Sequence, residues 1–202
     1  MPTNVRSLGA PVLVLNLKAY PNCLGAGATS LGTLLAQRAR FRNVAAAVCP
    51  SAPDLGRLAG QLPIPVLSQH TDAVDPGAHT GAIVPESLLA SGVAGSLLNH
   101  SEHPLSGEEV ARAVGRLQAL GLVPLVCAKD VEDARRLARS RPEFLAVEPP
   151  ELIGGDRSVS PARPEVIRGT VEAVHEVSPG TLVLCGAGVH DRNDVRIALE
   201  LG

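Results

Sequence analysis

The sequence of 202 residues has almost no aromatic side chains: it holds one Tyr, two Phe and no Trp. Proteins that bind single-stranded nucleic acid stack the bases on aromatic faces, so the composition disfavours that class. Acidic and basic residues are interspersed along the chain, and the net charge is -2 at pH 7. The chain has no long basic run that could neutralise a phosphate backbone. We therefore expect no nucleic-acid partner.

Long apolar runs are absent as well. No segment approaches the roughly 20 apolar residues that cross a bilayer as a helix. The first ten residues, MPTNVRSLGA, lack the basic start and apolar stretch of a signal peptide. The sequence predicts a cytoplasmic protein that has no membrane partner.

The chain has no CxxC pair. Its four cysteines are Cys23, Cys49, Cys127 and Cys185, and three of them follow or end apolar runs. This distribution favours buried free thiols over a disulfide framework or a zinc site. His70, His79 and His103 fit no familiar ligand spacing, so we expect no metal and no cofactor.

Apolar residues, mainly Ala, Val and Leu, make up 45% of the chain. Short apolar runs alternate with longer segments of helical period, which is typical of βα units on a parallel sheet in an α/β fold. The alternation continues without a linker, so we expect one domain over residues 1–202. Periodicity alone fits an open doubly wound sheet as well as a closed barrel. The expected strands are 12–16, 44–49, 65–69, 95–99, 123–127, 144–148 and 181–185.

Helix-start signals follow several of these strands. Ser106 and Glu109 have the spacing of a capping box, Asp130 and Asp191 stand at N-cap positions, and Gly121 marks a helix end. The expected helices are 28–40, 54–61, 85–91, 106–120, 130–139, 163–177 and one that begins near 193.

Polar and glycine residues gather at the carboxyl ends of the predicted strands, where active sites of such folds lie. The four segments are Asn16-Leu17-Lys18, Asn99-His100-Ser101-Glu102, Glu148-Pro149-Pro150-Glu151-Leu152-Ile153-Gly154 and Cys185-Gly186-Ala187-Gly188.

These residue types fit one kind of chemistry. A strand-end carboxylate can abstract a proton from carbon, and an imidazole and a lysine can polarise the adjacent carbonyl and stabilise an enediolate. Glycine-rich loops can aim backbone N–H groups at a phosphate. The combination indicates proton transfer next to a carbonyl in a small phosphorylated substrate.

The same segments, in the same order, resemble those of triosephosphate isomerases. NHSE at 99–102, VEPPELIG at 147–154, CGAG at 185–188 and QHTDAVDPGAHTG at 69–81 look like the archaeal branch. The resemblance implies a TIM (β/α)8-type barrel with seven βα units visible and the eighth missing after Gly202. It implies an isomerase of glycolysis and gluconeogenesis that interconverts D-glyceraldehyde 3-phosphate and dihydroxyacetone phosphate.

The resemblance also implies residue roles. Glu148 would be the base, His100 the electrophile and proton relay, and Lys18 a source of positive charge. Ser101 and Glu102 would support the site. The substrate-binding residues would be Asn16, Lys18, Gly154, Gly186, Ala187 and Gly188.

Family members form homo-oligomers, so we expect a dimer or tetramer with residues 71–80 as the interface loop. Gly155-Asp156-Arg157 stands where the archaeal pattern continues with Thr-Gly, which places an acid beside the phosphate loop. The alternative is therefore a non-catalytic binder of phosphate ligands, or a truncated barrel that has lost turnover.

Overall fold

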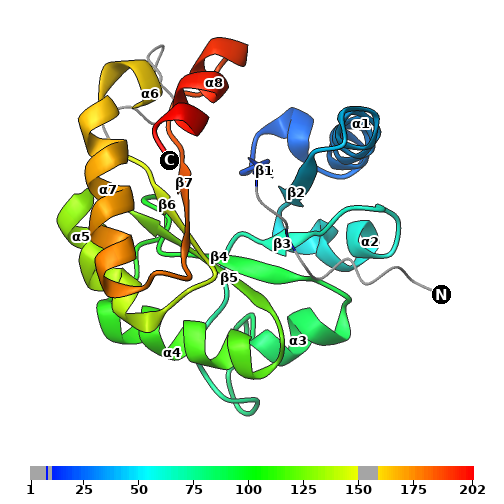
Figure 1. The fold of residues 1–202 in the computed structure, drawn as a ribbon. Helices are drawn as coiled ribbons and strands as arrows, with labels where there is room; N and C mark the ends of the chain where they lie inside the picture. Colours follow the sequence, from blue (N-terminus) through cyan, green and yellow to red (C-terminus); the bar gives the residue numbers. More distant parts are fainter. Residues whose placement is uncertain (1–7, 9–10, 150–158) are drawn as a thin grey trace. The chain divides into compact units, whose positions relative to one another are not determined.

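The computed structural model describes residue 8, residues 11–149 and residues 159–202 (Figure 1). Within it the chain divides into two compact units. Unit 1 contains Met1–Leu97 and Gly115–Val123, and unit 2 contains Leu98–Val114 and Pro124–Gly202.

Seven strands occur among the described residues, and every pairing given below is parallel. They are β1 (Val12–Asn16), β2 (Ala45–Cys49), β3 (Leu67–Ser68), β4 (Gly95–Leu98), β5 (Val123–Ala128), β6 (Phe144–Val147) and β7 (Leu182–Cys185).

Helical segments alternate with these strands. The α-helices are α1 (Ala26–Arg42), α2 (Leu55–Ala59), α3 (Pro85–Ala90), α4 (Gly107–Ala119), α5 (Val131–Leu137), α6 (Val159–Ala162), α7 (Pro164–Val177) and α8 (Arg192–Glu200). Short 3-10 helices are η1 (Pro21–Cys23), η2 (Ala52–Asp54) and η3 (Ala138–Ser140).

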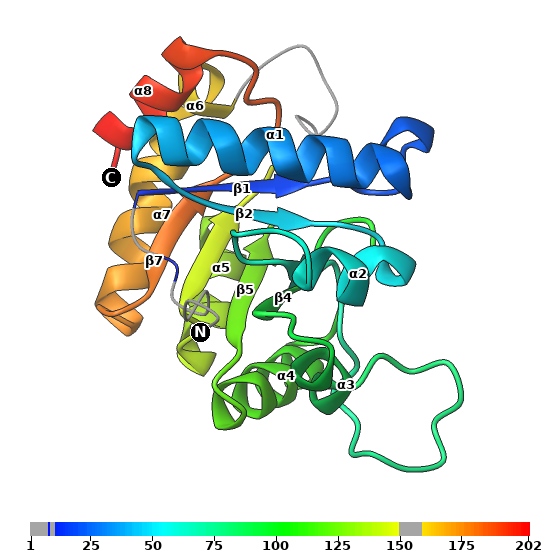
Figure 2. The same cartoon turned by 90° about the vertical axis from the view of Figure 1, so that its right-hand side faces the viewer.

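In unit 1, β1 pairs with β2, a single bridge joins Val48 to Val66 just before β3, and β3 pairs with β4. Helix α1 runs along β1 and β2 (Figure 2). Its buried stripe consists of small residues, Ala28, Gly32, Ala36 and Ala39. A Cβ on Gly32 would lie 2.6 Å from the Leu62 side chain, so glycine permits this close approach.

In unit 2, β5, β6 and β7 are neighbours in that order. Helices α5 and α7 pack side by side against this sheet, and α6 contacts α8 (Figure 1). Strands β5 and β6 are buried along their whole length, which explains why their sequences are continuous apolar runs rather than alternating ones.

The strand order decides between the two architectures that periodicity left open. A doubly wound sheet reverses direction at a switch point, with strand orders such as 3-2-1-4-5-6 or 2-1-3-4-5. Here β1 pairs with β2, the bridge from Val48 to Val66 joins β2 to the start of β3, and β3 pairs with β4, while β5, β6 and β7 also follow chain order without reversal. This singly wound order is the order of a barrel.

Most predicted elements are confirmed, with differences at their ends. Ser106 and Glu109 form the predicted capping box, since each backbone N–H donates to the side chain of the other. Asp130 and Asp191 cap α5 and α8 through their carboxylates. The prediction for β3 was too long, because only Leu67–Ser68 is a strand. Neither η1 nor α6 was predicted.

Candidate active site

A histidine and a glutamate of unit 2 face each other, and each follows the end of a strand. His100 follows β4 and Glu148 follows β6, and His100 Nε2 lies 3.4 Å from Glu148 Oε2. The His100 side chain is 8% exposed and that of Glu148 is 21% exposed. A nearly buried imidazole facing a partly exposed carboxylate is an arrangement in which both groups reach one small substrate.

The hydrogen bonds of the imidazole fix its tautomer. The backbone N–H of Glu102 donates to His100 Nδ1 over 3.2 Å, so Nδ1 carries the lone pair and Nε2 carries the hydrogen. The Glu102 carboxylate lies farther away, with Oε2 3.6 Å from Nδ1. His100 therefore presents an N–H donor on the side of Glu148, which suits it to polarise a carbonyl oxygen.

Asn99 holds this loop in place, a role that the sequence did not reveal. Its backbone is left-handed with φ 59°, which turns the chain directly after β4. Its side-chain amide donates to the Cys127 carbonyl over 2.9 Å, and its amide oxygen accepts the Leu105 N–H over 2.9 Å. One side chain thus ties both ends of the His100 loop, and asparagine tolerates that backbone conformation better than most residues.

Gly186 lies against the Glu148 side chain. A Cβ on Gly186 would lie 2.4 Å from Glu148 Oε1 and 2.6 Å from its Cγ, which is closer than any real contact. The Gly186 N–H donates to the Val147 carbonyl over 3.0 Å. Gly186 therefore leaves space for the carboxylate, and its N–H is already engaged within the sheet end.

The next two residues of the glycine-rich loop both have positive φ, 71° at Ala187 and 65° at Gly188. The Ala187 carbonyl accepts the N–H of Val159 over 3.1 Å, which fixes the start of α6 to this loop. Gly154, predicted to share phosphate binding, lies outside the described residues. Ser101 is exposed and lines a cavity that Glu148 also lines.

The predicted residues of unit 1 follow β1. Asn16 is the last residue of β1, and its side-chain oxygen accepts the Lys18 N–H over 3.0 Å. Lys18 is half-buried and has φ 51°, a left-handed conformation that is unfavourable for lysine. The intervening Leu17 is buried, and its N–H donates to the Cys49 carbonyl at the end of β2.

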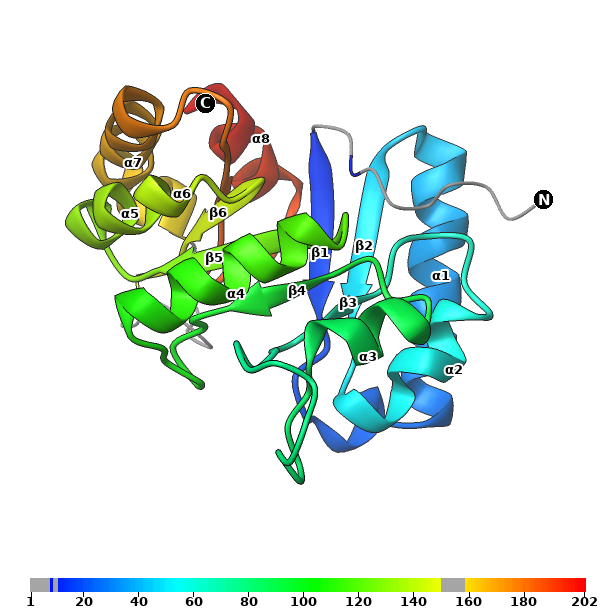
Figure 3. The ribbon, with the colours of Figure 1, turned by 90° about the horizontal axis from the view of Figure 1, so that it is seen from below.

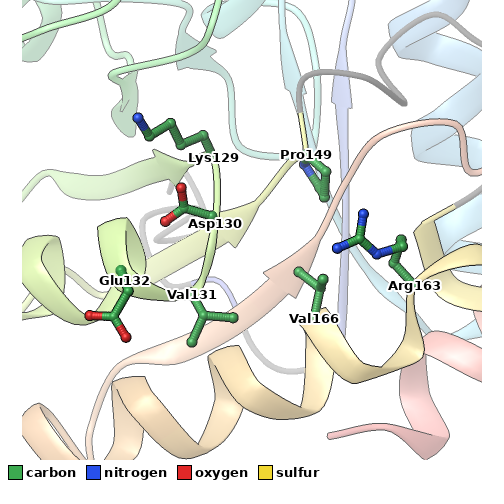
Figure 4. Close-up of a pocket in the computed structure, with 7 residues that line it drawn as sticks. All are labelled: Lys129, Asp130, Val131, Glu132, Pro149, Arg163 and Val166. Atoms are coloured by element: carbon green, nitrogen blue, oxygen red, sulfur yellow. The ribbon is translucent and has the colours of Figure 1, made fainter.

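Two cavities open in unit 2. The smaller, of about 380 Å³, is lined by Asn99, Ser101, Lys129 and Glu148 among others, so it contains the candidate base. The larger, of about 470 Å³, lies between the start of α5 and the start of α7 (Figure 4). Its charged groups are mixed in sign.

Charged side chains in both cavities have structural partners: Arg163 pairs with Glu165 in the larger one, and Arg136 pairs with Asp133 in the smaller one. The smaller cavity is the better candidate for substrate because Glu148, the candidate base, lines it.

Three further features bear on binding and compartment. No group of three or more His, Cys, Asp or Glu side chains converges as a metal site in the part of the chain that the structure describes. None of the described helices has the length and apolar character needed to cross a bilayer. All four cysteines are free thiols, three of them buried.

Comparison with known proteins identifies relatives along the whole described region. The family that matches is "Triosephosphate isomerase", over residues 11–202. The triosephosphate isomerase of Cenarchaeum symbiosum is 46% identical over 193 residues, which cover 96% of this chain and 86% of that protein. Those of Methanothermobacter thermautotrophicus and Caldivirga maquilingensis are each 42% identical over 192 residues, covering 95% of this chain and 84% and 85% of the relatives.

The relatives are archaeal, as the motifs at the strand ends predicted, and the parallel βα order agrees with the TIM barrel of this family. Because the match extends from residue 11 to residue 202, the chain belongs to the triosephosphate isomerase family.

Proposed function

We propose that this chain interconverts D-glyceraldehyde 3-phosphate and dihydroxyacetone phosphate by proton transfer through an enediolate, in glycolysis and gluconeogenesis and without a cofactor. The observation that supports it most is the approach of His100 Nε2 to Glu148 Oε2 at 3.4 Å, in a member of the triosephosphate isomerase family. A base and a hydrogen-bond donor at this separation can act on adjacent carbon and oxygen atoms of one substrate.

In this proposal the Glu148 carboxylate removes a proton from the carbon next to the carbonyl. The Nε2–H of His100 donates to the carbonyl oxygen, so that the negative charge which develops there is stabilised. Glu148 then returns the proton to the neighbouring carbon while His100 relays protons between the two oxygens. The Glu102 N–H supports the step because it holds Nδ1 as an acceptor.

Lys18 supplies positive charge to the anionic substrate, and Asn16 helps to orient the substrate, while its side-chain oxygen also accepts the Lys18 N–H. We assign phosphate binding to Ala187 and Gly188, which follow β7, and to Gly154, which belongs to the separate segment that follows β6. Ala187 and Gly188 both have positive φ, so this loop departs from extended backbone directly after β7, and successive backbone N–H groups in such turns can form an anion-binding concavity.

The test is a coupled assay for isomerisation of glyceraldehyde 3-phosphate, with the purified 202-residue chain and its Glu148→Gln variant. Glu148→Gln keeps the size of the side chain but removes the base, so we expect turnover to fall by about 1,000-fold or more. Glu172→Gln, an exposed change on α7, is the matched control and should keep full activity. Near-full activity of Glu148→Gln would overturn the mechanism.

The assay also addresses the alternative of a phosphate-ligand binder. A folded chain that shows no turnover, but whose melting temperature rises with triose phosphate, would reject the isomerase and support the binder.

We further propose that the chain self-associates through residues 71–80, between β3 and α3. The base of this loop is fixed by three hydrogen bonds to Ile83. Thr71 Oγ1 and the Asp72 N–H both donate to the Ile83 carbonyl, and the Ile83 N–H donates to the Asp72 carboxylate. Arg116 forms ion pairs with Asp75 and Glu86 that anchor the loop further. Residues 75–81 are exposed, and the loop extends away from α3 (Figure 3).

A fixed base with an exposed tip suits a loop that docks into a second copy. Ala78→Glu, a charge at the exposed tip, should reduce the mass measured by light scattering after gel filtration. An unchanged mass would reject this loop as the interface.

We assign the protein to the cytoplasm, where its free thiols stay reduced.

A further inference from the structure

The backbone of Lys18 needs support from its neighbours. Its φ of 51° is one that a residue with a long side chain rarely adopts. Asn16 holds the N–H of Lys18 from one side, at 3.0 Å. Strained conformations persist where the surrounding structure holds them, so a partner for the Lys18 carbonyl would hold this one from the other side.

Gln69 supplies that partner from a different part of unit 1. It directly follows β3, and its side-chain nitrogen lies 3.0 Å from the Lys18 carbonyl and 2.9 Å from the Cys49 carbonyl. The two hydrogens of a primary amide diverge, so a single group can donate to both carbonyls. Gln69 thereby connects the ends of β1, β2 and β3.

The neighbours of Gln69 keep its backbone in position. Ser68 Oγ donates to the His70 carbonyl over 2.6 Å, and His70 Nε2 lies 3.3 Å from Asp72 Oδ1. Gln69 itself is half-buried. Its amide is therefore presented to the two carbonyls by a segment that is fixed on both sides.

We propose that Gln69 is a positioning residue for Lys18: its amide holds the Lys18 carbonyl, keeps the backbone left-handed and so directs the ammonium group to the substrate. The inference rests on the proposed function, in which Lys18 supplies charge to a triose phosphate. A glutamate at this position could not act in the same way, because an ionised carboxylate only accepts and would face two carbonyl acceptors.

The decisive experiment is a double-mutant cycle on kcat/KM with Gln69→Met and Lys18→Met. Methionine keeps the length of glutamine and removes both donors. Alone, Gln69→Met should lower kcat/KM by about tenfold. In the Lys18→Met background the same change should leave kcat/KM within about twofold, because the ammonium that it positions is no longer there.

Two further variants complete the design. Gln37→Met, an exposed change on α1, should leave kcat/KM unchanged. Gln69→Glu should be at least as damaging as Gln69→Met, because it removes the donors and adds repulsion. A Gln69→Met effect that is equal in both backgrounds would show a general structural role and would overturn the proposal.

A second readout does not depend on turnover. Backbone chemical shifts report the sign of φ at Lys18, and positive φ should be present in the intact chain and lost in Gln69→Met. Retention of positive φ in that variant would overturn the proposal even if the chain catalysed no isomerisation. Loss of positive φ in a chain without turnover would instead reject the proposed function and retain the role of Gln69 in holding the Lys18 backbone.

Discussion

The two units hold their candidate site residues by different means. In unit 2, His100 and Glu148 face each other directly, and Glu148 fits only because Gly186 has no side chain. In unit 1, Lys18 is held through its backbone, by hydrogen bonds from Gln69 and to Asn16.

This difference indicates which changes each unit tolerates. Positions fixed by packing are sensitive to added volume, because interiors have little free space. Positions fixed by hydrogen bonds to a strained backbone are sensitive to the loss of donors and to residue type at the strained position. Unit 2 should therefore respond most to added volume beside Glu148, and unit 1 most to changes at Lys18 and its hydrogen-bond partners.

The largest expected effect is on Glu148. Gly186→Ala places a Cβ 2.4 Å from Glu148 Oε1, so the carboxylate must move, and a displacement of about 1 Å can lower kcat about 100-fold. Steady-state kinetics measure the change. Gly180→Ala is the matched control, since a Cβ there meets nothing within 4 Å and activity should persist. Equal kcat in the two variants would remove the packing explanation.

The next effect concerns Asn99, the residue of unit 2 whose side chain holds the His100 loop through two hydrogen bonds. Asn99→Ala removes two hydrogen bonds and leaves the Cys127 carbonyl without this donor, so the free energy of unfolding should fall by about 2–3 kcal/mol. Asn99→Gly should be about 1 kcal/mol less destabilising than Asn99→Ala, because glycine adopts φ 59° without strain. Urea denaturation compares the two; a more stable alanine variant would contradict the assignment of strain.

A smaller effect of the same kind is expected at Lys18. Glycine normally destabilises a chain relative to alanine, but at φ 51° the order should reverse, with Lys18→Gly more stable than Lys18→Ala by about 1 kcal/mol. Thermal denaturation of the two variants measures the difference. The usual order, with alanine more stable, would mean that the backbone at residue 18 relaxes once lysine is removed.

The smallest effect is a pH dependence in unit 1. The hydrogen bond from Arg57, followed by that from the Gly25 N–H, lowers the pKa of Asp54 below its usual value. Because the folded-state pKa is the lower one, this stabilisation is present above the unfolded pKa of about 3.9 and is lost as pH falls through the folded pKa. The melting temperature of Asp54→Asn should therefore depend less on pH below about pH 4 than that of the parent chain.

Glu165 of unit 2 provides the comparison. Its pKa is also lowered, chiefly by the hydrogen bond from Arg163, but its side chain is 66% exposed. Solvent screens such pairs, so Glu165→Gln should leave the pH dependence of melting unchanged. If the melting temperatures of Asp54→Asn and the parent chain depended on pH in the same way, the hydrogen bonds of Asp54 with Gly25 and Arg57 would not contribute to stability.

Local patterns in the sequence predicted most of the fold. The ends of β1, the capping box at Ser106 and the N-caps at Asp130 and Asp191 depend on residues close together in the chain, which is why they could be read directly. The length of β3 was overestimated, because only Leu67 and Ser68 pair with β4 and the apolar run does not reveal where pairing stops. Resemblance to a known family supplied the candidate roles of His100, Glu148 and Lys18.

The sequence by itself determined which residues stand at the strand ends and in what order. Only the tertiary structure decided that Gly186 gives space to Glu148, that Asn99 reaches the end of β5 and that Gln69 reaches Lys18. Each of these contacts joins residues 28 to 51 positions apart, or residues on neighbouring strands. Such partners meet only after the parallel strands align their carboxyl ends, because local sequence spacing carries no information about a hydrogen bond or a steric contact between separate βα units.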